Sequence, residues 1–363
     1  MIPVVKPYLP EKEKFQSYVS NIYESGYLSN NGPYVKLLEE RLSEYLGLKN
    51  IICVANGSIA LQVIYKSLKL NGEVLTTPFS FAATSSTLRW ENLDVSYSDI
   101  NKLSLNVDPL FLENQINKNT SAILATHVFG NPCDIGSLEK IGNDYGIRII
   151  YDAAHAFGVR LDNKSLLKAG SASAISFHAT KLFHTIEGGA VITDDDDLAE
   201  KIREMINFGM KDGIPHEMVA TNGKMNEFQA SMGLCVLDEI NLIYSKRKAI
   251  WDNYMTELQN YFEIQTWHSH SSNNYSYAPI IFDTEEKLIS TMDYLQKHEI
   301  QTKRYFYPSL STLNYSSKEY YCPISESISR RILCLPIYPD LEHEVQSFII
   351  QKIICSLNEK SIN

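Results

Sequence analysis

The sequence has no apolar run long enough to cross a membrane, and it does not open with the apolar segment of a signal peptide. A membrane helix needs about 20 consecutive apolar residues, whereas residues 1–7 already hold two prolines and a lysine. The six cysteines are scattered, without a CxxC pair or metal-ligand spacing. We therefore expect no membrane association, no metal site, and free thiols in a reducing cytoplasm.

Basic residues are outnumbered by acidic ones, and the formal net charge is −10. This balance argues against a general nucleic-acid-binding protein. It also means that an anionic ligand must be held by local donors rather than by the field of the whole protein. With 363 residues, 44% hydrophobic content and no internal repeat, the chain is typical of a globular protein of two domains.

Strand-like and helix-like segments alternate between residues 50 and 200. Short apolar runs at 51–54, 74–77, 122–126, 148–151 and 174–177 are each followed by a turn or a helical pattern. This alternation predicts an α/β fold with a mostly parallel sheet covered by helices on both faces. Ligands in such sheets bind at the carboxyl ends of the strands. A long helix at 237–262 and a tyrosine-rich remainder predict a small C-terminal α/β domain at 241–363, after a large domain at 1–240.

Lys181 stands between two strand-like runs, 174–177 and 190–193, and is followed by the pair Gly188-Gly189. This places the lysine on a fixed loop, where its amine can form a Schiff base with a carbonyl compound. A lone surface lysine is the commoner explanation of such a residue. That explanation leaves the neighbouring hydroxyl residues Ser176 and Thr180 unaccounted for.

Asp152 ends the apolar run 148–151. A carboxylate at the end of a buried strand needs a partner, and a protonated pyridine nitrogen is one. A strand-end aspartate together with a loop lysine is what pyridoxal phosphate chemistry requires.

The order Asp-Ala-Ala at 152–154, Ser-Phe-His-Ala-Thr-Lys at 176–181 and Glu-Gly-Gly-Ala at 187–190 resembles the DegT/DnrJ/EryC1/StrS sugar-nucleotide aminotransferases. The matching segments extend from the N-terminus to near residue 340. The resemblance implies a fold-type-I, aspartate-aminotransferase-like protein that uses pyridoxal 5'-phosphate, passing through pyridoxamine 5'-phosphate. It implies L-glutamate as amino donor and a nucleotide-linked keto-sugar as acceptor. Lys181 and Asp152 match the catalytic residues of the family.

The resemblance also supplies a set of cofactor-binding residues. From the residues alone, the turn before residue 59 fits an ordinary helix start capped by serine as well as a phosphate site, and Phe81 fits a core position as well as an aromatic face over the cofactor ring. The family match favours the cofactor in both cases, and it implies a homodimer in which Asn222 reaches the phosphate of the partner subunit. The set is Gly57, Ser58, Phe81, Asp152, His155, Ser176, Lys181 and Asn222.

Candidate substrate-binding residues come from three segments. The glycine- and asparagine-rich loop at 26–33 lies beside the active site in the family, although its composition fits a plain turn between helices equally well. Lys224 matches a basic position of the family, and basic residues near 303 fit exposed charges as well as a diphosphate site. The candidates are Leu28, Asn30, Lys224, Lys303, Arg304 and Tyr307.

Two residues depart from the common family pattern. His155 stands where most members have a glutamine that contacts the 3-hydroxyl of the cofactor, and Ile186 replaces the usual glycine before Glu-Gly-Gly. The first change affects the tuning of the cofactor ring, and the second affects the shape of the lysine loop.

Several functions remain open within this resemblance. Residues 27–33, 127–134, 155 and 183–189 look most like members that aminate C4 of a dTDP-4-keto-6-deoxyhexose, giving dTDP-4-amino-4,6-dideoxyglucose for a surface polysaccharide such as O-antigen. Amination at C3 and the use of GDP- or UDP-linked 4-keto-sugars are alternatives. A family branch that dehydrates sugars carries histidine in place of the lysine, so Lys181 argues against it. A non-catalytic regulator of the same fold would need neither Lys181 nor Asp152.

Overall fold

The computed structural model describes residues 1–315 and 318–358. Its main sheet is built from strands β1 (Asn50–Val54), β2 (Glu73–Thr76), β3 (Asp94–Tyr97), β4 (Thr120–Thr126), β5 (Arg148–Asp152), β8 (Ala172–Ser176) and β9 (Gly189–Thr193). Among the described residues this sheet has seven strands in the order β1-β9-β8-β5-β4-β2-β3. Pairing is parallel from β8 to β3, and β9 is antiparallel to both β8 and β1. The predicted mostly parallel sheet is confirmed.

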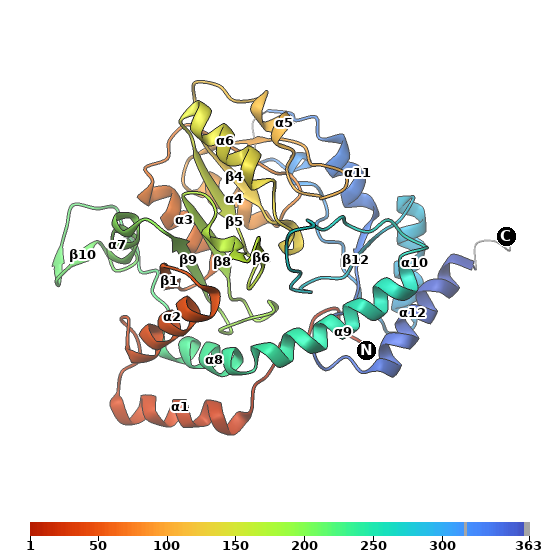
Figure 1. Cartoon of the computed structure of the whole chain (residues 1–363), viewed down its shortest axis with the longest axis horizontal. Coiled ribbons are helices and arrows are strands. Elements are labelled where there is room, and N and C mark those ends of the chain that lie inside the picture. Colours follow the sequence, from red (N-terminus) through yellow and green to blue (C-terminus); the bar gives the residue numbers. More distant parts are fainter. Residues whose placement is uncertain (316–317, 359–363) are drawn as a thin grey trace.

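Helices cover both faces of this sheet (Figure 1). Ile52 and Val54 of β1 pack with α3 (Gly57–Ser67), α4 (Ala82–Trp90) and α7 (Asp196–Met205). Ile51 and Cys53 point to the opposite face, where they pack with α2 (Pro33–Leu46) and α8 (Glu227–Asp238). Successive residues of a strand face opposite sides. The same alternation therefore decides which helices each strand-end side chain meets.

Shorter elements complete the N-terminal part of the chain. α6 packs beside β5, and α1 packs on α8 (Figure 1). These elements are α1 (Lys12–Ser25), α5 (Pro109–Glu113), α6 (Ile135–Tyr145), the 3-10 turns η1 (Val128–Gly130) and η2 (Leu166–Lys168), and the hairpins β6 (Arg160–Leu161) with β7 (Lys164–Ser165) and β10 (Met210–Lys211) with β11 (Ile214–Pro215).

The C-terminal part forms an apolar cluster of its own, made chiefly by residues of α9, α10 and α12. The first residues of the chain join it, since Ile2 pairs with Ile300. The long α9 leads from the sheet region towards this part (Figure 1). Its elements are α9 (Ile240–Leu258), β12 (Pro279–Ile281), α10 (Glu285–Lys297), η3 (Leu310–Thr312), α11 (Pro323–Arg331), β13 (Ile332–Cys334) and α12 (His343–Asn358).

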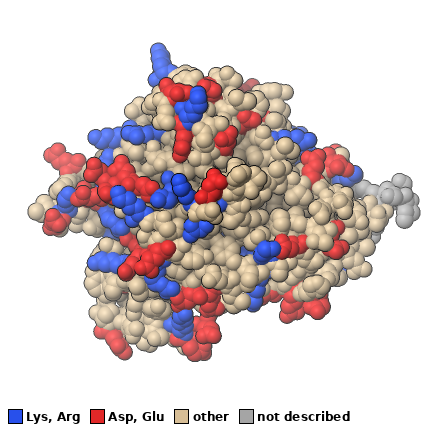
Figure 2. Space-filling view, viewed as in Figure 1, with Lys and Arg blue, Asp and Glu red and all other residues tan. Residues whose placement is uncertain are grey.

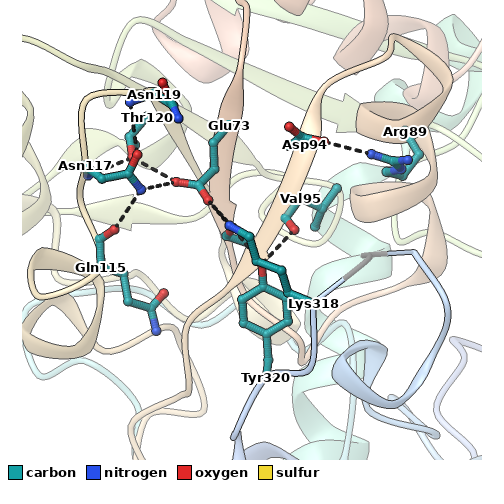
Figure 3. A network of polar contacts seen from close by, with 11 residues as sticks. Glu73, Arg89, Asp94, Val95, Gln115, Asn117, Asn119, Thr120, Lys318 and Tyr320 are labelled. Atoms are coloured by element: carbon teal, nitrogen blue, oxygen red, sulfur yellow. Dashed lines mark hydrogen bonds and ion pairs between the residues drawn. The ribbon is translucent and has the colours of Figure 1, made fainter.

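A polar network joins the C-terminal segment to the amino ends of β2 and β3 (Figure 3). The buried carboxylate of Glu73 accepts hydrogen bonds from Ser96 (2.5 Å), Asn117 (2.6 Å) and Thr120 (3.1 Å), and Lys318 lies 3.3 Å from it. Burial acts to raise the pKa of Glu73, but these four partners outweigh it and lower that pKa below its usual value.

The long helix predicted at 237–262 is shorter in the structure. It corresponds to α9, which spans Ile240–Leu258, and residues 237 and 238 are the end of α8. In the tyrosine-rich remainder, extended segments are short. Between residues 275 and 282 the strand is limited to Pro279–Ile281, and residues 301–308 contribute a single bridge between Lys303 and Cys334. Tyr277 and Phe306 of these two segments pack against the ring of His155.

Candidate active site

Lys181 lies, as predicted, on the loop between β8 and β9. Backbone hydrogen bonds close the base of this loop, from Phe177 to Gly188 (2.8 Å) and from Thr185 to Phe177 (2.9 Å). Burial lowers the pKa of Lys181 from its usual value to about 8, although the carboxylate of Asp152 acts in the opposite direction. The free amine is therefore available near neutral pH, as a Schiff-base lysine requires.

Asp152 is the last residue of β5 and is 6% exposed. It shares a strand face with Ile150, which packs in the cluster of α3 and α4. Thr84 of α4 donates its hydroxyl to the carboxylate at 2.7 Å, and the backbone N–H of Ala154 donates to it at 3.2 Å. Burial raises the pKa of Asp152, while these hydrogen bonds and the nearby charge of Lys181 act against the rise. Asp152 and Lys181 are thus close enough for the charge of each to influence the pKa of the other.

Gly57 and Ser176 meet at the same edge and face of the sheet. A Cβ atom built on Gly57 would lie 3.1 Å from Cβ of Ser176, so a larger residue would crowd the end of β8. Asn56 caps α3 by accepting the N–H of Ile59 at 2.9 Å. Ser58 lies in the first turn, where backbone N–H groups have no partner within the helix. The arrangement offers N–H and hydroxyl donors to a phosphate.

Phe81 and Asn222 lie close to this edge but are exposed. Phe81 is 59% exposed and stands directly before α4, the helix that supplies Thr84. Asn222 pairs with Asn207, and the next residue, Gly223, accepts the N–H of Ala55 at 2.7 Å. The segment that carries Asn222 therefore runs beside the end of β1.

His155 is buried beside Lys181. Its Nδ1 accepts the backbone N–H of Phe129 at 3.3 Å, and its ring stacks on Phe306 with centroids 5.6 Å apart. Burial, reinforced by the charge of Lys181, holds the pKa of His155 well below its usual value. A neutral ring that accepts at Nδ1 carries its proton on Nε2. His155 can therefore donate a hydrogen bond, as a glutamine side chain at this position could.

The substrate candidates fall into two groups. Asn30 and Lys224 line one cavity of about 430 Å³, in which the buried Nζ of Lys224 has no hydrogen-bond partner among the described residues. Leu28 is 54% exposed on the same loop. Its carbonyl accepts the N–H of Glu227, whose carboxylate in turn accepts two N–H groups at the start of α2. Sequence reasoning had given no role to Glu227.

Arg304 is poorly placed to bind a diphosphate. Its side chain is only 13% exposed, and its guanidinium forms an ion pair with Glu285 at 2.7 Å and covers the ring of Tyr307. Lys303 lies over the ring of Tyr305. The sequence around Arg304 shows only neighbouring basic and aromatic residues, so it could not indicate that the Arg304 side chain is largely covered.

Two further residues of the site gave no sequence signal. Thr84 contacts Asp152 across 68 residues of chain, and the hydroxyl of Tyr277 lies 3.3 Å from Nζ of Lys181 across 96 residues. A small cavity beside the lysine is lined by Ala154, His155, Phe157, Ser176, Thr180, Lys181, Leu182, Ser276 and Tyr277.

Comparison with known families decides how this geometry is interpreted. The model of the DegT/DnrJ/EryC1/StrS aminotransferase family matches residues 10–354. The chain belongs to the DegT/DnrJ/EryC1/StrS aminotransferase family. It is 37% identical over 354 residues to the dTDP-4-amino-4,6-dideoxy-D-glucose transaminase of Escherichia coli, covering 95% of each chain. It is 29% identical to the GDP-perosamine synthase of Vibrio cholerae, covering 94% of this chain and 95% of that one.

Solved structures agree with this membership of the DegT/DnrJ/EryC1/StrS family. The structure of DesI in the presence of its TDP-sugar product superposes with a TM-score of 0.94 at 29% identity, covering 99% of this chain and 94% of that one. The predicted α/β fold of type I is therefore confirmed, and the protein is an aminotransferase.

Outside this site, the described residues show neither a membrane-spanning helix nor a metal-binding cluster. No helix within residues 1–315 and 318–358 has the length and apolar character needed to cross a membrane. The same residues contain no group of three or more histidine, cysteine, aspartate or glutamate side chains arranged to hold a metal ion.

Proposed function

We propose that this aminotransferase transfers the amino group of L-glutamate to C4 of a dTDP-linked 4-keto-6-deoxyhexose and so forms dTDP-4-amino-4,6-dideoxyglucose. The observation that carries the proposal is the 37% identity, over 95% of both chains, to a transaminase named for this product. A GDP-linked 4-keto-sugar is the second candidate, supported by the 29% identity to a GDP-perosamine synthase. We place the product in the synthesis of a surface polysaccharide such as O-antigen.

Pyridoxal phosphate is the cofactor that the residues at the strand ends fit. The start of α3 lies beside the hydroxyl of Ser176, so backbone N–H groups and a hydroxyl are available to a phosphate there, and a carboxylate and an amine of altered pKa lie on the same edge. When bound, pyridoxal phosphate supplies an electron sink for the carbon that loses its proton. Gly57, Ser58 and Ser176 would hold its phosphate, and Phe81 and His155 would contact its ring.

Each of the two charged residues has a separate task in this proposal. Asp152 would face the pyridine nitrogen of the bound cofactor and favour its protonated form, because a carboxylate inside a low-dielectric site favours a positive partner. Lys181 would hold the cofactor through Nζ, and the same atom would serve as general base and acid. A pKa of about 8 lets that nitrogen gain and lose a proton near neutral pH.

The test uses the purified protein with pyridoxal phosphate, L-glutamate and a panel of 4-keto and 3-keto sugars linked to dTDP, GDP or UDP. We expect turnover with the dTDP-4-keto-6-deoxyhexose and an NMR spectrum of the product with nitrogen at C4. Nitrogen at C3, or turnover confined to GDP- or UDP-sugars, would overturn the substrate assignment. Failure to bind the cofactor would overturn the proposal as a whole.

We also propose a homodimer in which Asn222 completes the site of the partner subunit. Two large apolar side chains, Trp90 and Val219, are each 78% exposed and line one hollow together with Ser58 and Thr221. A second copy of the chain is the occupant that would bury them beside the start of α3. On the face drawn in Figure 2, acidic and basic side chains are interspersed, without a broad area of one sign.

Mixed dimers test this arrangement directly. Lys181→Ala and Asn222→Ala chains are each expected to form dimers of low activity. Co-expressed, they would form dimers in which one site has both wild-type residues, so activity should return to about a quarter of wild type when the chains assort randomly. No recovery above the Asn222→Ala level would mean that Asn222 acts within its own chain. Light scattering gives the oligomeric state of each sample.

Two further assignments concern the whole chain. We propose a boundary near residue 240 between the large and the small domain, supported by the separate apolar cluster of the C-terminal part.

We also propose a cytoplasmic location. All six cysteines are free thiols, and five of them are buried, which suits a reducing compartment.

A further inference from the structure

Residues 274–277 carry a tyrosine from the C-terminal part of the chain to the catalytic lysine. Asn274 fixes this segment to the loop after β5. Its amide nitrogen donates to the carbonyls of His155 (2.7 Å) and Phe157 (3.1 Å). A Cβ on Gly130 would lie 2.8 Å from the same carbonyl of His155 and 3.0 Å from the Asn274 side chain. The segment is therefore packed closely on its sheet side.

Arg247 of α9 fixes the same segment from the other side. Its side chain is 5% exposed, and its N–H groups donate to the carbonyls of Tyr275 (3.0 Å) and Ser276 (2.7 Å). Tyr275 has a φ of 55°, so the backbone turns sharply here. With anchors before and after the turn, the direction of the next side chain, Tyr277, is determined by the fold.

The hydroxyl of Tyr277 accepts a hydrogen bond from Nζ of Lys181 at 3.3 Å. Its ring lies 4.7 Å from the ring of His155 and 5.1 Å from that of Phe129. Burial raises the pKa of Tyr277 far above its usual value, which keeps the hydroxyl neutral. A neutral hydroxyl can accept from an ammonium group and donate to an amine.

We propose that Tyr277 is a positioning residue that holds Nζ of Lys181 in place whenever this nitrogen is free. The amine then takes up and returns its proton from one fixed position in the site. This role rests on the proposed transaminase function and adds to it a residue outside the family motifs quoted above. It also explains why the buried anchors Asn274 and Arg247 are placed at this turn.

The test compares Tyr277→Phe with Tyr244→Phe in the full-length protein. The Tyr244→Phe variant also lacks a buried hydroxyl. In the wild type this hydroxyl donates to the carbonyl of Phe157 at 2.7 Å and does not contact the lysine. We expect Tyr277→Phe to lower kcat about tenfold, as the loss of one positioned hydrogen bond would, with KM for both substrates within about twofold of wild type. Tyr244→Phe should keep kcat within about twofold of wild type.

A second measurement does not depend on turnover. Cofactor-free protein is treated with an amine-acylating reagent at a series of pH values, and labelling of Lys181 is followed by mass spectrometry. Because Tyr277 accepts from the ammonium form, its loss should disfavour that form and move the labelling curve to lower pH. Melting temperatures show whether each variant is folded. Asn274→Ala, which frees the segment but keeps the hydroxyl, should move kcat in the same direction by a smaller factor.

These measurements distinguish a failure of the role proposed for Tyr277 from a failure of the proposed transaminase function. A labelling curve and kcat of Tyr277→Phe that match wild type would overturn the proposal, as would equal effects in Tyr244→Phe. If wild-type protein binds no cofactor and turns nothing over, the proposed function fails. A shift in labelling would then support the contact between Tyr277 and Lys181 while refuting its part in catalysis.

Discussion

Replacing Thr84 by valine removes the shortest hydrogen bond that Asp152 accepts. Thr84 is completely buried, and its hydroxyl lies 2.7 Å from the carboxylate, whereas the remaining donor, the N–H of Ala154, lies at 3.2 Å. A hydrogen bond to a charged group contributes about 1.5–3 kcal/mol. Without it the carboxylate form becomes less favourable, so the pKa of Asp152 should rise further.

If the ionised form of Asp152 is less stable, its interaction with the pyridine nitrogen of the cofactor should be weaker, and so should cofactor binding. At the lower end of that range, about 1.5 kcal/mol, the Kd for pyridoxal phosphate should rise about tenfold. The assay is an absorbance titration of cofactor-free protein with pyridoxal phosphate, supported by urea unfolding of the same samples. Thr87→Val is the matched control, because Thr87 lies on the same helix, is 5% exposed and donates to the carbonyl of Ala83 instead.

Both valine variants should lose about 1–3 kcal/mol of unfolding free energy, because each loses two hydrogen bonds of a buried hydroxyl. Besides the bonds already named, the hydroxyl of Thr84 lies 2.7 Å from that of Ser80, and the hydroxyl of Thr87 lies 3.3 Å from that of Tyr65. Only Thr84→Val should lose affinity for the cofactor. Equal values of Kd in the two variants would refute the link from Thr84 through Asp152 to the cofactor. An unchanged Kd in Thr84→Val would show that the carboxylate does not depend on this hydroxyl.

Three further changes give distinct outcomes. Lys181→Ala should abolish transamination and the visible absorbance of bound cofactor, and retained turnover in this variant would exclude Lys181 as the catalytic lysine. In the cofactor-free wild type, acylation of Lys181 should rise through about pH 8. Ile186→Gly should raise unfolding free energy in urea by about 0.5–1 kcal/mol, because Ile186 has a φ of 70°; a loss of stability would argue against backbone strain. Glu73→Gln should cost about 1–2 kcal/mol at pH 7. Since the folded-state pKa of Glu73 is lowered, this difference should be complete above the unfolded value of about 4.3 and vanish as the pH falls through the folded value; a difference unchanged between pH 7 and pH 3 would contradict the network around Glu73.

Strand ends could be predicted from the sequence because they follow from local pattern. The apolar run before Asp152 and the small residues around Gly57 define a strand and a helix start without reference to the rest of the chain. In the sheet, β9 is antiparallel to both β1 and β8, and β8 is parallel to β5, so β1 and β5 run in the same direction and end at one edge. Lys181 follows from the same reasoning, since its loop begins where β8 ends.

The contacts that tune these residues could not be predicted, because they join distant segments. Nothing near Thr84 or Tyr277 in the sequence distinguishes either residue from the chain's other threonines and tyrosines. The positive φ of Ile186 is likewise set by tertiary structure, since a β-branched residue avoids that region by itself. The burial of Arg304 depends on Glu285, which lies in a different element.

The altered chemistry of Lys181 depends on both parts of the chain. The sheet edge supplies the lysine and Asp152, but the cavity beside the amine is also lined by Tyr277 and by His155, on whose ring Phe306 stacks. Desolvation is the main cause of the low pKa of Lys181. Any change that moves the C-terminal segment away from the loop after β5 should therefore return the amine towards ordinary lysine behaviour, even with every residue of the sheet edge unchanged.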